Sequence, residues 1–179
     1  MKEFRSTKFL FVLAVILLAA STRFISDIPN FNPFWAVAFF AGAMIPGRFK
    51  AIAIPLAALF ISDIFLGFHA DMLAVYLGFA LMIFIGRVLM NKPDIYNIGG
   101  GAVLGAVLFY LITNFSSWIT MGTYPMTWDG LISCYAAAIP FFRNAILSTV
   151  LFTYAFFGVN LLFEKFVIGR NLLPAKIGS

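Results

Sequence analysis

The sequence has few charged residues, one cysteine and one histidine. Asp, Glu, Lys and Arg together make up 11% of its 179 residues, against about a quarter in ordinary soluble domains. A single cysteine excludes an internal disulfide and any cysteine-rich zinc or iron–sulfur site within the chain. With one histidine, a zinc site built only from this chain is not expected, and the sequence implies no other cofactor.

The sequence also lacks the signatures of an ATPase or a hydrolase. It has no G-x-x-x-x-G-K-[ST] phosphate loop, because no lysine follows the glycine-rich stretch at 99–105, and it has no H-E-x-x-H motif. The spacing of Gly101-x-x-x-Gly105 instead predicts close helix packing in lipid. We therefore expect no enzymatic activity. An intramembrane enzyme is the less favoured alternative, with acid–base or metal-holding candidates at Asp63, His69, Asp71 and Asp129.

Apolar residues dominate the chain instead. Hydrophobic residues make up 63% of it, and 23 residues are phenylalanine. A soluble fold of this size has too much surface for its volume to bury so much apolar area. The net charge of +5 does not indicate nucleic-acid binding, because the basic residues form no long patch. We therefore predict an integral membrane protein whose solvent is the lipid bilayer.

Apolar runs divide the chain into six candidate spans within one transmembrane domain, residues 1–179. A spanning helix needs about 20 apolar residues. The second run is short, which predicts a tilted or partly spanning helix. The last run has an amphipathic lead-in from Trp128. The expected helices of this all-α bundle cover about residues 8–24, 31–45, 50–66, 72–90, 98–121 and 140–163.

The basic residues predict the orientation of the bundle. Ten of the 12 fall in four clusters, which six spans place on one side. The positive-inside rule then puts both termini in the cytoplasm. A cleaved signal peptide, with Ala19-Ala20-Ser21 as its site, is the alternative for the first run, but its loss would spoil this agreement. The clusters are Lys2, Arg5 and Lys8; Arg48 and Lys50; Arg87 and Lys92; and Lys165, Arg170 and Lys176.

Asp63 lies near the outer end of the third predicted helix, in an otherwise apolar run. A bare charge costs about 3 kcal/mol at mid-membrane on insertion scales and less near the interface, so such residues normally face a partner or a cavity. Two interpretations stay open. Asp63 pairs with Arg143 or Arg23 as a structural brace, or it contacts a ligand.

The outer loops carry three further polar candidates. The segment Ile28-Pro-Asn-Phe-Asn-Pro33 predicts an Asx turn in which Asn32 caps the second helix, with Pro33 in its first turn. Asn30 and Asn32 are also candidates for a ligand lid. His69, in the next outer loop, is either a solvated loop residue or a ligand contact.

The segment from Trp128 to Asn144 is the richest in polar and aromatic groups. Pro140 removes a backbone hydrogen bond and can kink a helix, which would frame a cavity. Arg143 and Asn144 follow within one turn, and Tyr135 precedes them. The planar guanidinium of Arg143 suits a carboxylate or a phosphate of a ligand. It would equally form an ion pair with Asp63.

The remaining candidates have simple alternatives. Cys134 is either a small packing residue or a soft ligand to a metal-bearing cofactor, such as a corrinoid cobalt. Trp118, Tyr124 and Trp128 gather around the connection between the fifth and sixth helices. An aromatic belt at the membrane interface accounts for them, and a flat ring-bearing ligand would also stack there.

Five motifs spread over the chain carry a family resemblance. They are Asn30-Phe-Asn-Pro33, Leu56-Ala-Ala-Leu-Phe-Ile-Ser-Asp63, Leu66-Gly-Phe-His69, Thr113-Asn-Phe115 and Cys134-Tyr-x-x-Ala-Ile-Pro-Phe-Phe-Arg-Asn144. Together they resemble a bacterial membrane family related to the substrate-binding S components of energy-coupling factor (ECF) transporters. The resemblance covers nearly the whole chain.

This resemblance implies about six helices that bind a vitamin or metal ion from outside and topple against a coupling subunit driven by two ATPases. S components typically carry Ala-x-x-x-Ala on the first helix for that docking. Here Ala14 and Ala19 are one residue too far apart, and Ala53-x-x-x-Ala57 lies on the third helix instead. This departure leaves room for a solitary S-like protein.

We therefore expect the substrate-binding membrane subunit of a small-nutrient or vitamin importer in the bacterial plasma membrane. Its ligand would be ring-bearing or anionic. A structural or assembly protein without a ligand is the alternative. The candidate lining residues are Asn30, Asn32, Asp63, His69, Trp118, Tyr124, Trp128, Tyr135, Arg143 and Asn144.

Overall fold

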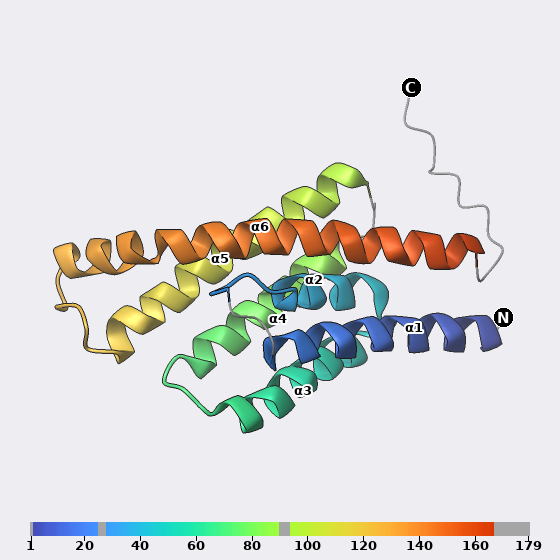
Figure 1. Cartoon of the computed structure of the whole chain (residues 1–179), viewed down its shortest axis with the longest axis horizontal. Helices are drawn as coiled ribbons and strands as arrows, with labels where there is room; N and C mark the ends of the chain where they lie inside the picture. The colour runs from blue at the N-terminus through green and yellow to red at the C-terminus, as the bar shows by residue number, and fades with distance from the viewer. Residues whose placement is uncertain (1, 25–27, 90–93, 167–179) are drawn as a thin grey trace.

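A computed structural model describes residues 2–24, 28–89 and 94–166, and these residues form helices and no strand. The predicted all-α architecture is confirmed (Figure 1). Lys92, Arg170 and Lys176 lie outside the described residues. The elements are α1 (Lys2–Ser21), the 3-10 helix η1 (Thr22–Phe24), α2 (Phe34–Met44), α3 (Arg48–Leu66), α4 (Met72–Leu89), α5 (Ile95–Thr120) and α6 (Trp128–Phe166).

Five segments are long and apolar enough to cross a membrane: α1 with η1, α3, α4, α5 and α6. Even in α4, the most buried of them, only 39% of the residues are buried within the chain. Their remaining apolar side chains would be costly to expose to water. These helices therefore indicate a membrane protein.

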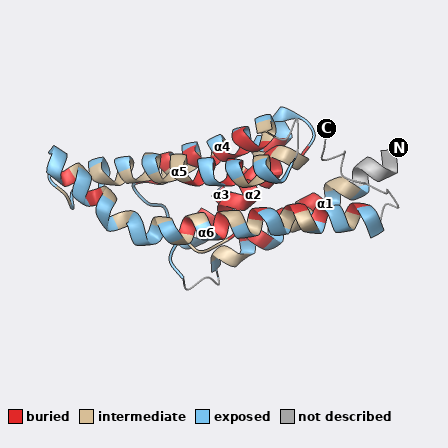
Figure 2. Cartoon of the chain, turned by 90° about the horizontal axis from the view of Figure 1, so that it is seen from above, coloured by how far each residue is buried: buried red, intermediate tan, exposed pale blue. Residues whose placement is uncertain are grey.

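The helix α2 differs from the others, because its 11 residues cover only about half of a bilayer core. Its side chains from Phe34 to Ala41 are at most 6% exposed, and it contacts each of the other five α-helices. It ends at Met44, and the following residue, Ile45, precedes Pro46 and is extended, as is favoured for a residue before proline. The short second run is thus a core helix (Figure 2).

Glycines allow α2 and α4 to pack backbone against backbone. A Cβ atom at Gly42 would overlap the carbonyl group of Ile83, and one at Gly86 would overlap the carbonyl group of Phe39. At both positions a larger residue would collide with the backbone of the other helix, so only glycine permits this contact. This close approach holds α4 against the core helix.

The predicted packing of Gly101 and Gly105 is confirmed on α5. A Cβ atom at Gly101 would lie 2.6 Å from the ring of Phe39, and one at Gly105 would overlap the sulfur of Met82. The intervening turn is also closely packed, since Ala102 is 0% exposed. Small residues thus bring α5 against α4 and the core helix.

The last helix, α6, is a single element of 39 residues that continues through Pro140. The predicted lead-in and the predicted last span are therefore one helix. Its C-terminal half buries a row of polar residues, and Glu164 at the end of this row forms an ion pair with Lys8 of α1. The row comprises Ser148, Thr149, Thr153, Asn160 and Glu164.

The helices alternate in direction along the bundle. The start of α1, the turn between α2 and α3 and the end of α6 lie at one end (Figure 1). The loop at 67–71 and the loop at 121–127 lie towards the other end. Each of these two loops carries a predicted site residue, His69 in the first and Tyr124 in the second.

Candidate functional site

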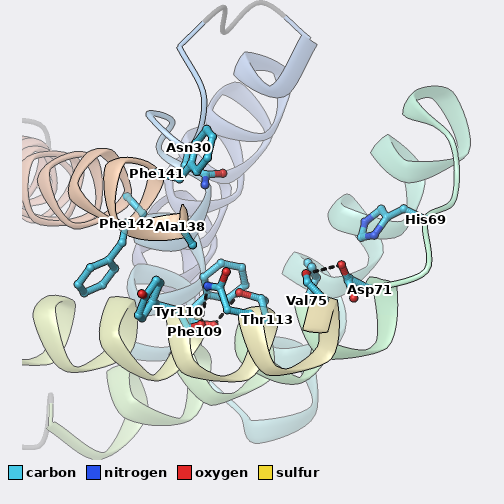
Figure 3. Close-up of a pocket in the computed structure, with 13 residues that line it drawn as sticks. Asn30, His69, Asp71, Val75, Phe109, Tyr110, Thr113, Ala138, Phe141 and Phe142 are labelled. Atoms are coloured by element: carbon cyan, nitrogen blue, oxygen red, sulfur yellow. Dashed lines mark hydrogen bonds between the residues drawn. The ribbon is translucent and has the colours of Figure 1, made fainter. Parts of the chain in front are cut away.

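A cavity of about 250 Å³ opens among the loop at 28–33, the loop at 67–71 and the facing parts of α5 and α6 (Figure 3). One side is polar and the other is aromatic. Two of the predicted site residues, Asn30 and His69, line it. The full lining is Asn30, His69, Asp71, Val75, Phe109, Tyr110, Thr113, Asn114, Ser117, Ala138, Phe141, Phe142 and Ala145.

Asp71 is the buried acid of this cavity, 6% exposed. Its Oδ1 accepts hydrogen bonds from Ser116 at 2.8 Å and Thr120 at 2.7 Å, and its Oδ2 accepts one from Ser117 at 2.6 Å. These bonds tie the loop at 67–71 to the last turns of α5. A carboxylate has about four acceptor positions, so one remains for a donor in the cavity.

The surroundings of Asp71 keep it ionised. Burial by itself would raise the pKa of Asp71, but the three hydroxyl hydrogen bonds and the nearby His69 outweigh burial and hold the pKa below its usual value. The cavity therefore presents a carboxylate at neutral pH. The sequence signal for this arrangement was the placement of Ser116, Ser117 and Thr120 on one face of an apolar helix.

Aromatic rings form the opposite wall. The ring of Tyr110 stacks on that of Phe142 with centroids 4.3 Å apart, and the Tyr110 hydroxyl donates to the carbonyl oxygen of Tyr135 at 2.6 Å. Tyr135 in turn donates to the carbonyl oxygen of Leu111 at 2.6 Å. Tyr135, a predicted contact, thus lies behind the wall and fixes the orientation of Tyr110.

The loop at 28–33 is held by residues that were predicted as ligand contacts. Asn32 Oδ1 accepts from the backbone N–H of Phe34 at 3.1 Å, as predicted for an Asx turn, but the predicted cap was wrong by one residue, because α2 begins at Phe34 with Pro33 and not Asn32 at its N-cap. Asn144 Nδ2 donates to the carbonyl oxygen of Pro29 at 3.1 Å. Asn30 has a φ of 58°, which asparagine tolerates better than most residues. Asn32 and Asn144 therefore position Asn30 at the cavity.

Asp63 lies outside this cavity and has a partner in the chain. It is 1% exposed, and its Oδ1 lies 2.7 Å from Nη1 of Arg23. Its Oδ2 accepts from the hydroxyl of Tyr76 at 2.9 Å. The guanidinium also lies over the ring of Phe34, 4.6 Å from its centroid. Of the two interpretations that the sequence left open, the structure supports the structural brace, in which Asp63 pairs with Arg23 and not with Arg143.

The other predicted contacts lie away from the cavity. Arg143 is exposed and, among the described residues, forms no ion pair. Trp118 donates to the carbonyl oxygen of Pro125 at 2.9 Å and so fixes the loop at 121–127. Trp128 is 79% exposed, and Tyr124 is partly exposed in the same region. None of these four side chains lines the cavity.

Cys134 is buried in the contact between α5 and α6. Its Sγ lies 3.6 Å from the carbonyl oxygen of Asn114, as expected for a weak thiol donor. Within the described ranges, no three His, Cys, Asp or Glu side chains are grouped closely enough to hold a metal ion. Cys134 therefore has the contacts of a packing residue.

The helices and the cavity define a class: a helical membrane protein with a small, partly polar, partly aromatic cavity near one end of its bundle. A family model, described as a family of unknown function (DUF6580), matches residues 4–171, and the chain belongs to this family. No curated protein and no solved structure matches the chain.

Proposed function

We propose that this protein is the substrate-binding membrane subunit of a small-nutrient importer in the bacterial plasma membrane. It takes its ligand into the cavity of Asn30, His69 and Asp71 from outside the cell, and both termini lie in the cytoplasm. The resemblance to ECF S components supports this proposal, as does the absence of a phosphate loop, because such subunits leave ATP to separate partners. Those partners would be a coupling subunit and two ATPases.

The composition of the cavity supports the choice of ligand. Its volume of about 250 Å³ is below the range of roughly 300–1,000 Å³ for drug-sized ligands, so it suits a small solute. The wall of Tyr110 and Phe142 offers a surface for ring stacking. Asp71 is ionised, and Arg143 is not in the lining. A neutral or cationic ring-bearing nutrient therefore fits better than an anion.

The single observation that carries this proposal is the buried, ionised carboxylate of Asp71 opposite an aromatic wall. Three hydroxyl groups hold the carboxylate in place, so it would meet the ligand without reorganisation. Such preorganisation favours binding because less freedom is lost. Asp63 differs in that Arg23 neutralises it within the fold, whereas Asp71 takes part in neither ion pair of the described residues.

The test is mass spectrometry of small molecules released from the protein purified in mild detergent. We expect one compound at about one equivalent. Ala138→Leu fills the cavity and should lower its occupancy at least tenfold. Ala136→Leu is the matched control, because Ala136 is exposed on the same helix, and it should retain the compound.

Asp71→Asn provides a second comparison, since it keeps the shape of the side chain and removes the charge. A cationic ligand should be lost from this variant, whereas a neutral one should be weakened only in part. An empty wild-type protein from rich medium, with no stabilising compound in a thermal-shift screen of nutrients, would overturn the proposal. That outcome would favour a structural or assembly role.

A further inference from the structure

A second cavity, of about 430 Å³, lies between α3 and α4. It is at the other end of the bundle from the first cavity, because α3 begins and α4 ends there (Figure 1). Arg48, the first residue of α3, and Arg87, in the last turn of α4, both line it. The rest of its lining is apolar. We refer to it as the α3–α4 groove.

The apolar part of the groove is open to the surroundings of the bundle. Ile52 is 45% exposed, Phe84 is 63% exposed and Val88 is 47% exposed. These side chains lie on spans that are long and apolar enough to cross a membrane, so lipid chains are their natural solvent. The tight packing of Gly86 on Phe39 holds α4 against the core helix α2.

The two arginines of the groove have no carboxylate partner in the described part of the chain, where the ion pairs are Lys8–Glu164 and Arg23–Asp63. The nearby basic residue Lys50 does not line the groove. Lys50 lies over the ring of Phe9, 5.9 Å from its centroid. Two unpaired guanidinium groups at the end of an apolar groove are complementary to a phosphate attached to acyl chains.

We propose that the α3–α4 groove binds one anionic phospholipid of the adjacent leaflet. Arg48 and Arg87 hold its phosphodiester, and an acyl chain lies against Ile52, Phe84 and Val88. Two positive charges facing one phosphate leave a surplus of positive charge. A zwitterionic lipid brings its own ammonium group to this position, so a lipid with net negative charge is preferred.

The test compares phosphatidylglycerol with phosphatidylcholine of the same acyl chains, added to the delipidated full-length protein in detergent. Native mass spectrometry counts bound lipids, and a thermal shift reports stabilisation. We expect one phosphatidylglycerol molecule to bind at least tenfold more tightly than phosphatidylcholine. In Arg48→Gln/Arg87→Gln this preference should fall to less than threefold.

The matched control is Lys50→Gln/Lys165→Gln, which removes two positive charges from the same end of the bundle but outside the groove. It should keep the preference. Equal preference in both double variants would show that general surface charge attracts the lipid and would overturn the proposal. An unchanged melting temperature of Arg48→Gln/Arg87→Gln in phosphatidylcholine establishes that this variant is folded.

A second pair of measurements separates the headgroup from the acyl chain. Ala80→Leu, which narrows the groove, should weaken phosphatidylglycerol binding while both arginines remain. Glycerol phosphate without acyl chains should not compete with the lipid at millimolar concentration. Full competition by glycerol phosphate would indicate a soluble-anion site and would overturn the assignment to a lipid.

Discussion

At the scale of single residues, the hydrogen-bonding partners distinguish two buried acids, Asp63 in the last turn of α3 and Asp71 directly before α4. Asp63 and Asp71 are 1% and 6% exposed. Asp63 meets a guanidinium and a phenol, whereas Asp71 meets three neutral hydroxyl groups. The first acid is neutralised within the fold, and the second remains a net negative charge at a cavity.

Asp63→Asn should destabilise the protein strongly. Arg23, whose side chain is 17% exposed, would lose its counter-ion, and breaking such a buried pair costs about 3–5 kcal/mol. Thermal unfolding in detergent measures this loss. Asp129→Asn, at an exposed position, should change the stability by less than about 0.5 kcal/mol. Equal effects of the two substitutions would contradict the assignment of the brace.

Asp71 should make the stability depend on acid pH. Because its pKa is lower in the folded chain than its ordinary value of 3.8, the unfolded chain binds more protons near that pH. Its contribution is therefore complete above that ordinary value and is lost as the pH falls through the folded pKa. Melting temperatures between pH 6 and pH 3 should decline less in Asp71→Asn than in the wild type. Parallel curves would argue against this role.

At the scale of elements, the short helix α2 organises the bundle. It contacts every other α-helix, and its glycine Gly42 receives the backbone of α4 at Ile83. The cavity depends on this packing indirectly, because α4 carries Val75 and follows directly after Asp71. A displacement of α4 would move both residues relative to α5.

Gly42→Val should therefore destabilise the protein by about 1–3 kcal/mol, the usual cost of overpacking a core. The added atoms would overlap the carbonyl group of Ile83, which cannot move without shifting α4. Gly100→Ala is the control, since a Cβ atom there meets nothing within 4 Å. It should leave stability unchanged or raise it by up to about 1 kcal/mol. Denaturation monitored by thermal shift distinguishes the two, and a neutral Gly42→Val would refute the close packing.

At the scale of the whole molecule, the two ends of the bundle differ in chemistry. One end carries the cavity with Asp71 and His69, and the other carries the groove with Arg48 and Arg87. The basic residues at the second end are the part of this difference that the positive-inside rule associates with the cytoplasmic side. In the functional proposal, the ligand therefore enters the Asp71 cavity on one side of the membrane, and the lipid binds the α3–α4 groove on the other.

Cysteine labelling tests that orientation. In a Cys134→Ala background, Thr123→Cys should react with a membrane-impermeant maleimide in intact cells, because Thr123 is exposed in the loop at 121–127. Phe49→Cys, at a position 81% exposed at the start of α3, should react only after the cells are permeabilised. The reverse pattern would invert the orientation and remove the outward-facing cavity.

Local chemistry in the sequence predicted much of this protein. Apolar runs long enough to span a bilayer must satisfy their own backbone hydrogen bonds, which makes them helices. The Asx turn at Asn32 and the close packing at Gly101 and Gly105 were also predictable, since each depends on neighbours a few residues apart or on the absence of a side chain.

The tertiary structure decided which side chains meet. Asp63 pairs with Arg23 and not with Arg143 because the end of α1 lies against α3, which no local pattern specifies. Asn32 and Asn144 hold a loop, whereas Asn30 and His69 reach the cavity with Asp71. Helix propensity and hydropathy depend on each residue and its near neighbours along the chain, but a cavity depends on the packing of several helices at once.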